Sequence, residues 1–116
     1  MTIYIAGPMS GKPNHNRGVF NEMAENLELC GHVALNPASL PATLPDAKYL
    51  PICMAMIEAA DAVFFLKGWQ HSEGAKAEYY YAKRQRKDLF FEEPQDERDP
   101  EALISNIAES LDELEL

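Results

Sequence analysis

One stretch constrains the fold more than any other: a short apolar run, a glycine-containing loop and a helix-forming segment follow one another. Residues 61–66 (Asp-Ala-Val-Phe-Phe-Leu) are bulky and bounded by polar residues, which predicts a buried strand. Residues 72–87 predict a helix, and Ser72 is suited to accept hydrogen bonds from its first free N–H groups. The loop around Gly68 therefore lies at the carboxyl end of a strand, where open α/β sheets bind ligands.

Glu78 is the residue of this helix that lacks a local ionic partner. Its neighbours three and four positions away are Gly74, Ala75, Tyr81 and Ala82. None of them is a cation, whereas Glu73 has Lys76 three residues further on and fits a solvated surface. A carboxylate without a local cation, one turn into a helix above a glycine loop, is a candidate nucleophile or base. The alternative is a glutamate that is exposed or paired at long range.

The N-terminal segment has the same layout. Residues 2–6 (Thr-Ile-Tyr-Ile-Ala) predict a strand, and the loop that follows contains Gly7 and Gly11. From about 16 to 30 the pattern is helical, with apolar residues recurring at three- and four-residue steps. A strand, a glycine loop and a helix form the layout of a phosphate- or sugar-binding first crossover, although the glycines match neither a dinucleotide fingerprint nor a P-loop.

The remaining segments complete an alternation of strands and helices. They are a strand at 32–36, a proline-stiffened loop at 37–46, a helix at 49–60, a strand at 88–91 and an acidic helix at about 100–115. In the second helix we expect Pro51 in the first turn, and Ile52, Met56 and Ala59 or Ala60 facing the core.

This alternation predicts a parallel sheet with right-handed crossovers. The expected fold is therefore α/β, a single domain over residues 1–116 with a Rossmann- or flavodoxin-like three-layer sandwich. The chain length suits about four strands, in the order 2-1-3-4.

Charge and composition limit the classes of partner that the chain is expected to bind. The chain of 116 residues carries a formal net charge of −9, so nucleic acid is a poor partner, although backbone N–H groups could still bind a small anion. No apolar run is long enough to span a membrane, and the N-terminus does not resemble a signal peptide. Cys30 and Cys53 lie in apolar helical contexts without metal-ligand spacing, which predicts reduced core cysteines of a cytoplasmic protein without a metal or cofactor.

Two motifs carry a resemblance to a known family. They are Tyr-Ile-Ala-Gly-Pro at 4–8 and Ser-Glu-Gly-Ala-Lys-Ala-Glu at 72–78. With them the chain resembles the nucleoside 2-deoxyribosyltransferase superfamily, which includes the deoxynucleoside 5′-monophosphate N-glycosidases. Ile3 to Met9 and the Gly68-Trp69 pair resemble a short branch frequent in phages and prophages. The resemblance covers about residues 2–92.

The resemblance implies roles for individual residues. Glu78 would be the nucleophile that attacks the anomeric carbon of a (deoxy)ribose and forms a glycosyl-enzyme ester, which water or a second base resolves. Tyr4 would orient this glutamate or the sugar. Ser72, with the amides near Gly74 at the helix start, suits a phosphate better than a neutral hydroxyl. The loop that would wrap the substrate comprises Gly7, Pro8, Met9, Ser10 and Gly11.

Cys53 departs from the family pattern. It stands where these enzymes carry an aspartate that helps to protonate the departing base or holds the sugar, and a thiol is only a weak donor. His71 or Glu73 could substitute from the neighbouring loop; His71 could equally be an ordinary loop residue. Trp69 could stack on a base or close the edge of the core.

Three functions remain open from the sequence. The first is an N-glycosidase of (deoxy)nucleoside 5′-monophosphates. The second is a catalytically impaired nucleotide- or sugar-binding protein that acts through a partner, as Cys53 would allow. The third is transfer of deoxyribose between bases. We also expect a homodimer or larger assembly, with the tyrosines at 79–81 and the C-terminal apolar stripe as candidate contacts.

Overall fold

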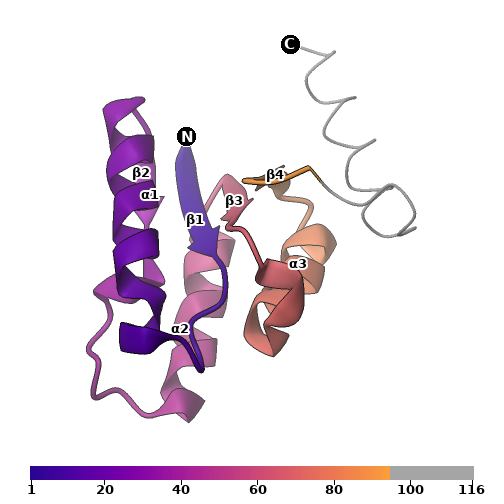
Figure 1. Cartoon of the computed structure of the whole chain (residues 1–116). Helices are drawn as coiled ribbons and strands as arrows, with labels where there is room; N and C mark the ends of the chain where they lie inside the picture. Colours follow the sequence, from indigo (N-terminus) through magenta and orange to yellow (C-terminus); the bar gives the residue numbers. More distant parts are fainter. Residues whose placement is uncertain (95–116) are drawn as a thin grey trace.

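The structure is a computed structural model that describes residues 1–94. Within them, four parallel strands form one sheet in the order β2-β1-β3-β4, which confirms the predicted fold and strand order (Figure 1). The strands are β1 (Thr2–Ala6), β2 (Val33–Leu35), β3 (Ala62–Phe65) and β4 (Asp88–Phe91). The helix expected at about 100–115 lies outside the described residues.

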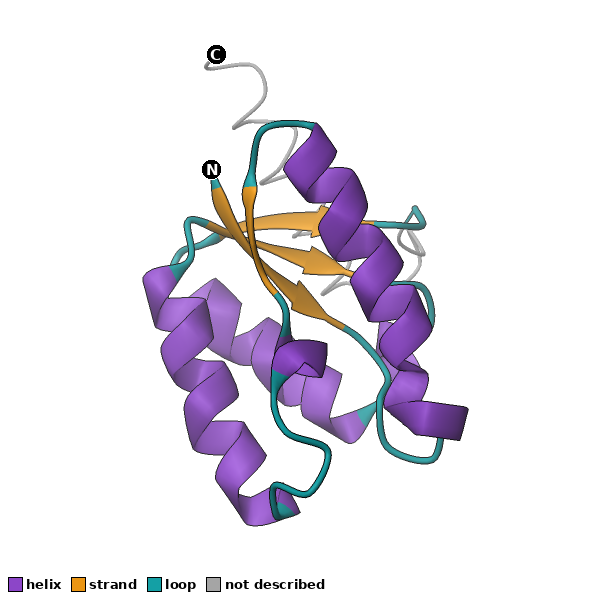
Figure 2. Cartoon of the chain, turned by 90° about the vertical axis from the view of Figure 1, so that its left-hand side faces the viewer, coloured by secondary structure: helices purple, strands orange, loops and turns teal. Residues whose placement is uncertain are grey.

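Helices cover both faces of the twisted sheet, as Figure 2 shows. They are α1 (Arg17–Leu29), α2 (Asp46–Ala59) and α3 (Glu73–Arg84). Three short 3-10 turns interrupt the loops: η1 (Pro13–Asn16), η2 (Pro37–Ser39) and η3 (Trp69–His71). The result is the three-layer arrangement expected when strands and helices alternate.

The central strand β1 links the two layers of the core. Its register pairs Tyr4 with Leu35 of β2 and with Val63 of β3. Because successive side chains of a strand point to opposite faces, Ile5 packs with Phe20 of α1, while Tyr4 packs in the cluster beneath α2 and α3. Tyr4 thus reaches the α2–α3 layer although only 1% of it is exposed.

Helix α2 differs from the sequence prediction in its start and its buried face. It begins at Asp46, so Pro51 lies beyond the first turn. Ile52 is 37% exposed, and the buried stripe consists of Cys53, Ile57 and Ala60 at steps of four and three. The prediction for Ile52 was wrong because a residue next to the buried stripe is turned about 100° away from it on a helix.

The two cysteines have different environments. Cys53 is buried, as expected, but Cys30 is exposed, which corrects the prediction of two core cysteines. Cys30 is the C-cap residue directly after α1, where the chain turns through Gly31 with a φ of 88°. The apolar stripe that holds α1 on the sheet has ended before this point.

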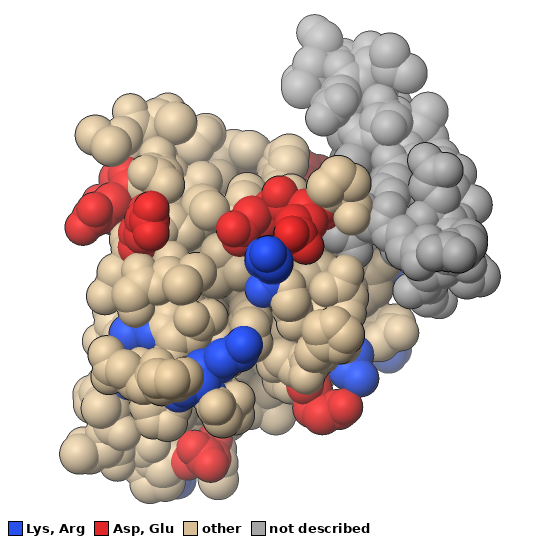
Figure 3. Space-filling view, viewed as in Figure 1, with Lys and Arg blue, Asp and Glu red and all other residues tan. Residues whose placement is uncertain are grey.

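The described surface carries charges of both signs. On the face shown in Figure 3, the Lys and Arg side chains of residues 1–94 lie in separate small groups, so no continuous basic surface faces this way. Among the helices of the same residues, none is long and apolar enough to cross a membrane.

Candidate active site at the carboxyl edge of the sheet

A pocket of about 630 Å³ lies at the carboxyl ends of the strands, a size typical of small-molecule sites. Its walls come from the loop after β1, the first turn of α1, the loop between β2 and α2, the first two turns of α2, and the loop and helix start after β3. The predicted site residues that line it are Tyr4, Gly7, Pro8, Met9, Ser10, Cys53, His71, Ser72, Gly74 and Glu78. Segments far apart in the sequence therefore meet at one pocket.

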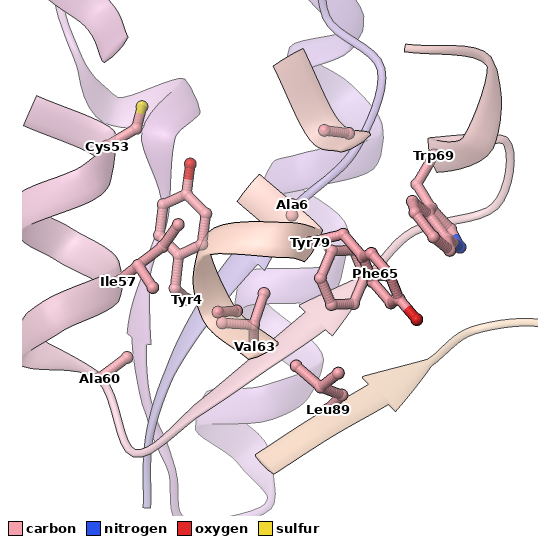
Figure 4. Packing of buried hydrophobic residues seen from close by; sticks show 12 residues of the cluster. Tyr4, Ala6, Cys53, Ile57, Ala60, Val63, Phe65, Trp69, Tyr79 and Leu89 are labelled. Carbon is pink, nitrogen blue, oxygen red and sulfur yellow. The ribbon is translucent and has the colours of Figure 1, made fainter. Parts of the chain in front are cut away.

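Tyr4, Glu78 and Cys53 form the closed end of this pocket. The Tyr4 hydroxyl donates a hydrogen bond to Oε2 of Glu78, and Glu78 is 8% exposed. Figure 4 shows the same hydroxyl directed towards the Cys53 thiol of α2. The carboxylate that lacked a partner along its own helix is thus buried, with a neutral hydroxyl from the central strand as its partner.

Burial raises the pKa values of Glu78, Tyr4 and Cys53. It raises the pKa of Glu78 from 4.5 to about 7, against the opposing effect of the hydrogen bond from Tyr4. Burial, followed by the negative charge of Glu78, raises the pKa of Tyr4 well above its usual value. Burial also raises the pKa of the Cys53 thiol. The hydrogen bond with Tyr4 opposes this rise in pKa, and the negative charge of Glu78 adds to it. At neutral pH the tyrosine and the thiol keep their protons, whereas Glu78 is present in both its protonated and its ionised form.

The start of α3 lies at the pocket wall. Ser72 caps the helix, and its Oγ accepts a hydrogen bond from the N–H of Ala75 at 3.2 Å, as predicted. Glu73 forms an ion pair with Lys76 at 3.0 Å, and its side chain is 93% exposed. Glu73 is therefore the solvated surface residue that its spacing to Lys76 indicated.

The loop after β1 approaches the end of β3 very closely at Gly7. A Cβ at Gly7 would lie 2.9 Å from both Cβ and Cδ1 of Leu66, so no larger residue fits without movement. This close approach brings the backbone of the loop over the end of the sheet. Gly7 is thus explained by packing in addition to any contact with a ligand.

The same loop contains three consecutive residues in the left-handed region: Asn14, His15 and Asn16 have φ values of 51°, 53° and 60°. Non-glycine residues adopt this conformation at a cost, and such residues concentrate at functional sites. The Asn16 side chain donates to the Pro8 carbonyl at 2.9 Å and so ties this turn to the first part of the loop. His15 and Lys12, which the sequence did not single out as site residues, both line the pocket.

Trp69 and Gly11, both expected at the substrate, do not line the pocket. Trp69 is 8% exposed, and its ring lies 4.7 Å from that of Tyr79 and 5.0 Å from that of Phe65 (Figure 4). Trp69 therefore closes the edge of the core, which is one of the two roles predicted for it. Gly11 forms the turn of the loop with a φ of 79°, and the space where its side chain would lie is open.

Helix α2 contributes pocket residues that the sequence did not reveal. Asp46, Tyr49 and Leu50 line the pocket together with Cys53, at helical steps of three and four. The signal was present in this spacing, but it was hidden because the helix was predicted to begin only at Tyr49. Among residues 1–94, no group of three or more His, Cys, Asp or Glu side chains is arranged to hold a metal ion.

Arg17 holds the outer part of this wall. Its Nη1 donates to the carbonyl of Ala38 and, at 3.2 Å, to that of Leu40. Its Nη2 lies 3.4 Å from the Tyr49 hydroxyl, which itself donates to the Pro41 carbonyl at 2.9 Å. The loop between β2 and α2 is therefore tied to the start of α1.

Comparison with known proteins assigns the chain to a family. Residues 1–91 match the family model described as a domain of unknown function, DUF4406. The chain belongs to the DUF4406 family. No curated protein matches the sequence closely enough to count as a relative.

A solved structure shares the fold of this DUF4406 protein. It is described as a "2-desoxiribosyltransferase from Leishmania mexicana", with a TM-score of 0.65 and 23% sequence identity. The match covers 81% of this chain and 65% of the other chain, so the DUF4406 protein spans about two thirds of its length. The two proteins thus share an α/β fold.

Proposed function

We propose that this DUF4406 protein hydrolyses the N-glycosidic bond of a (deoxy)nucleoside 5′-monophosphate through Glu78. The observation that supports this most directly is a buried carboxylate at the closed end of a pocket, held by the Tyr4 hydroxyl. The shared fold with a protein described as a 2-desoxiribosyltransferase supports a reaction at the sugar of a nucleoside.

In the proposed reaction, an ionised oxygen of Glu78 attacks the anomeric carbon of the sugar. The bond between this carbon and the base breaks, and the base leaves with the bonding electrons and takes up a proton from solvent. Water then hydrolyses the glycosyl ester, which restores the carboxylate and releases the sugar 5-phosphate. Tyr4 orients the carboxylate, because its raised pKa keeps its hydroxyl a hydrogen-bond donor.

Several features support a phosphate on the substrate. Ser72 and the free N–H groups at the start of α3 lie at the pocket wall, where the helix dipole favours an anion. Lys12 lines the same pocket and adds a positive charge. These groups can make more favourable contacts with a phosphate than with the hydroxyl of a free nucleoside.

The test is incubation of purified protein with the common ribo- and deoxyribonucleoside 5′-monophosphates, with chromatography of the free bases. We expect base release from at least one of them, and a loss of at least about 10³-fold in Glu78→Gln. The matched control is Glu25→Gln, which removes an exposed carboxylate from α1 and should retain activity. Equal activity in Glu78→Gln and the control would refute the mechanism.

A second candidate is a nucleotide-binding protein without turnover. The observation in its favour is Cys53, whose protonated thiol lines the pocket where a carboxylic acid would serve catalysis better. Thermal unfolding with nucleotides separates the two, because binding without base release supports this candidate. Addition of a second free base tests the third function, transfer, which predicts a new nucleoside or nucleotide.

A further inference from the structure

The pocket face of α2 leads from the closed end of the site to its mouth. Asp46, Tyr49, Leu50 and Cys53 all line the pocket. At a rise of 1.5 Å per residue, the backbone of Asp46 lies about 10 Å further along the helix axis than that of Cys53. The Cys53 thiol interacts with the Tyr4 hydroxyl and with the charge of Glu78. A group bonded to a sugar held at Glu78 would extend along this wall.

Tyr49 offers a fixed aromatic surface on the wall. Its hydroxyl donates to the Pro41 carbonyl at 2.9 Å and lies 3.4 Å from Nη2 of Arg17, so the ring is held from its far end. An aromatic ring that is already immobilised can stack on a base with little further loss of conformational entropy. Leu50 beside it is 50% exposed, which leaves apolar surface for a flat ring to cover.

Asp46 supplies the polar group at the outer end. Its carboxylate forms no hydrogen bond or ion pair with another described residue, and it lies exposed at the pocket wall. An ionised carboxylate only accepts hydrogen bonds, and its two oxygens match two donors that lie side by side. A base edge with two adjacent N–H donors therefore fits this position.

On the basis of the proposed function, we propose that this wall is the base subsite and that it selects guanine. Tyr49 and Leu50 contact the face of the base, and Asp46 accepts hydrogen bonds from N1–H and the 2-amino group. Hypoxanthine keeps N1–H but lacks the amino group. Adenine places a lone pair beside its single amino donor, and this lone pair repels a carboxylate.

The experiment measures binding of guanosine and inosine 5′-monophosphates by calorimetry. The protein carries Glu78→Gln, so that turnover does not interfere. We expect the guanine nucleotide to bind about tenfold more tightly. Adding Asp46→Asn should reduce this preference to less than about twofold. The matched control is Glu73→Gln, which removes a first-turn carboxylate from the other helix at the same pocket and should leave the preference in place.

A purely structural role of Asp46 gives a different result. As the first residue of α2 it also complements the helix dipole. Loss of that contribution would weaken both nucleotides equally and leave their ratio unchanged. Tyr49→Ala should weaken both by roughly tenfold, whereas Tyr49→Phe keeps the ring and should retain most of the affinity.

Any of three results would overturn the base subsite: equal affinity for the two nucleotides, no binding of either, or a preference that survives Asp46→Asn. The proposed hydrolysis fails separately: wild-type protein that binds the guanine nucleotide preferentially but releases no free base would keep the subsite and refute the reaction.

Discussion

At the scale of single residues, Glu78 combines the properties that the proposed reaction needs. Because its pKa is raised to about 7, the nucleophilic form is scarce in acid and dominant in base. We expect kcat/KM for base release to rise with pH through about 7 and then level off. Tyr4→Phe removes the hydrogen bond that opposes this shift, so it should move the rise to higher pH. A flat profile from about pH 5.5 to about 8.5 would contradict the role of Glu78.

The same burial makes Glu78 a source of pH-dependent stability. Its pKa is higher in the folded protein than in the unfolded chain, so the folded state binds more protons between about 4.5 and about 7. The stabilisation is complete below about 4.5 and is lost as the pH rises to about 7, by about 3 kcal/mol in total. Urea unfolding at about pH 5 and about pH 8 measures this loss, and it should be absent from Glu78→Gln. An equal loss in that variant would assign the effect to other groups.

At the scale of elements, the loop after β1 depends on its first glycine. Gly7→Ala would force a Cβ against Leu66, which is 1% exposed, and should cost about 1–3 kcal/mol of unfolding free energy. Gly18→Ala in α1 meets nothing within 4 Å and should stabilise the protein by about 0.5–1 kcal/mol. Thermal unfolding compares the two, and equal effects would show that the close approach at Gly7 does not matter.

At the scale of the whole molecule, the tyrosines of α3 are the candidate contact for a second copy. Tyr80 is 56% exposed although its ring lies 5.3 Å from that of the buried Tyr79. We propose a homodimer through these tyrosines, with light scattering giving twice the 13.0 kDa mass of the chain. Tyr80→Glu should yield monomers, whereas Leu29→Glu, at an 86% exposed position on α1, should not. Wild-type protein that remains monomeric would refute the contact.

Local patterns in the sequence determined the architecture and indicated Glu78 as the central residue of the candidate site. Strand and helix periods are read over a few residues, and the handedness of crossovers leaves few ways to order four parallel strands. The cap at Ser72 and the lack of a local cation for Glu78 were visible for the same reason, because both depend on neighbours within about one helical turn.

Only the tertiary structure decided which side chains share the pocket and how they ionise. The start and rotation of α2 place Asp46 and Tyr49 there, and contacts such as that from Arg17 to the 38–49 segment fix them. The partner of Glu78 lies 74 residues away on the central strand, and its pKa follows from burial beneath several elements. Burial and pairing of this kind arise from contacts between distant segments, which no short stretch of sequence contains.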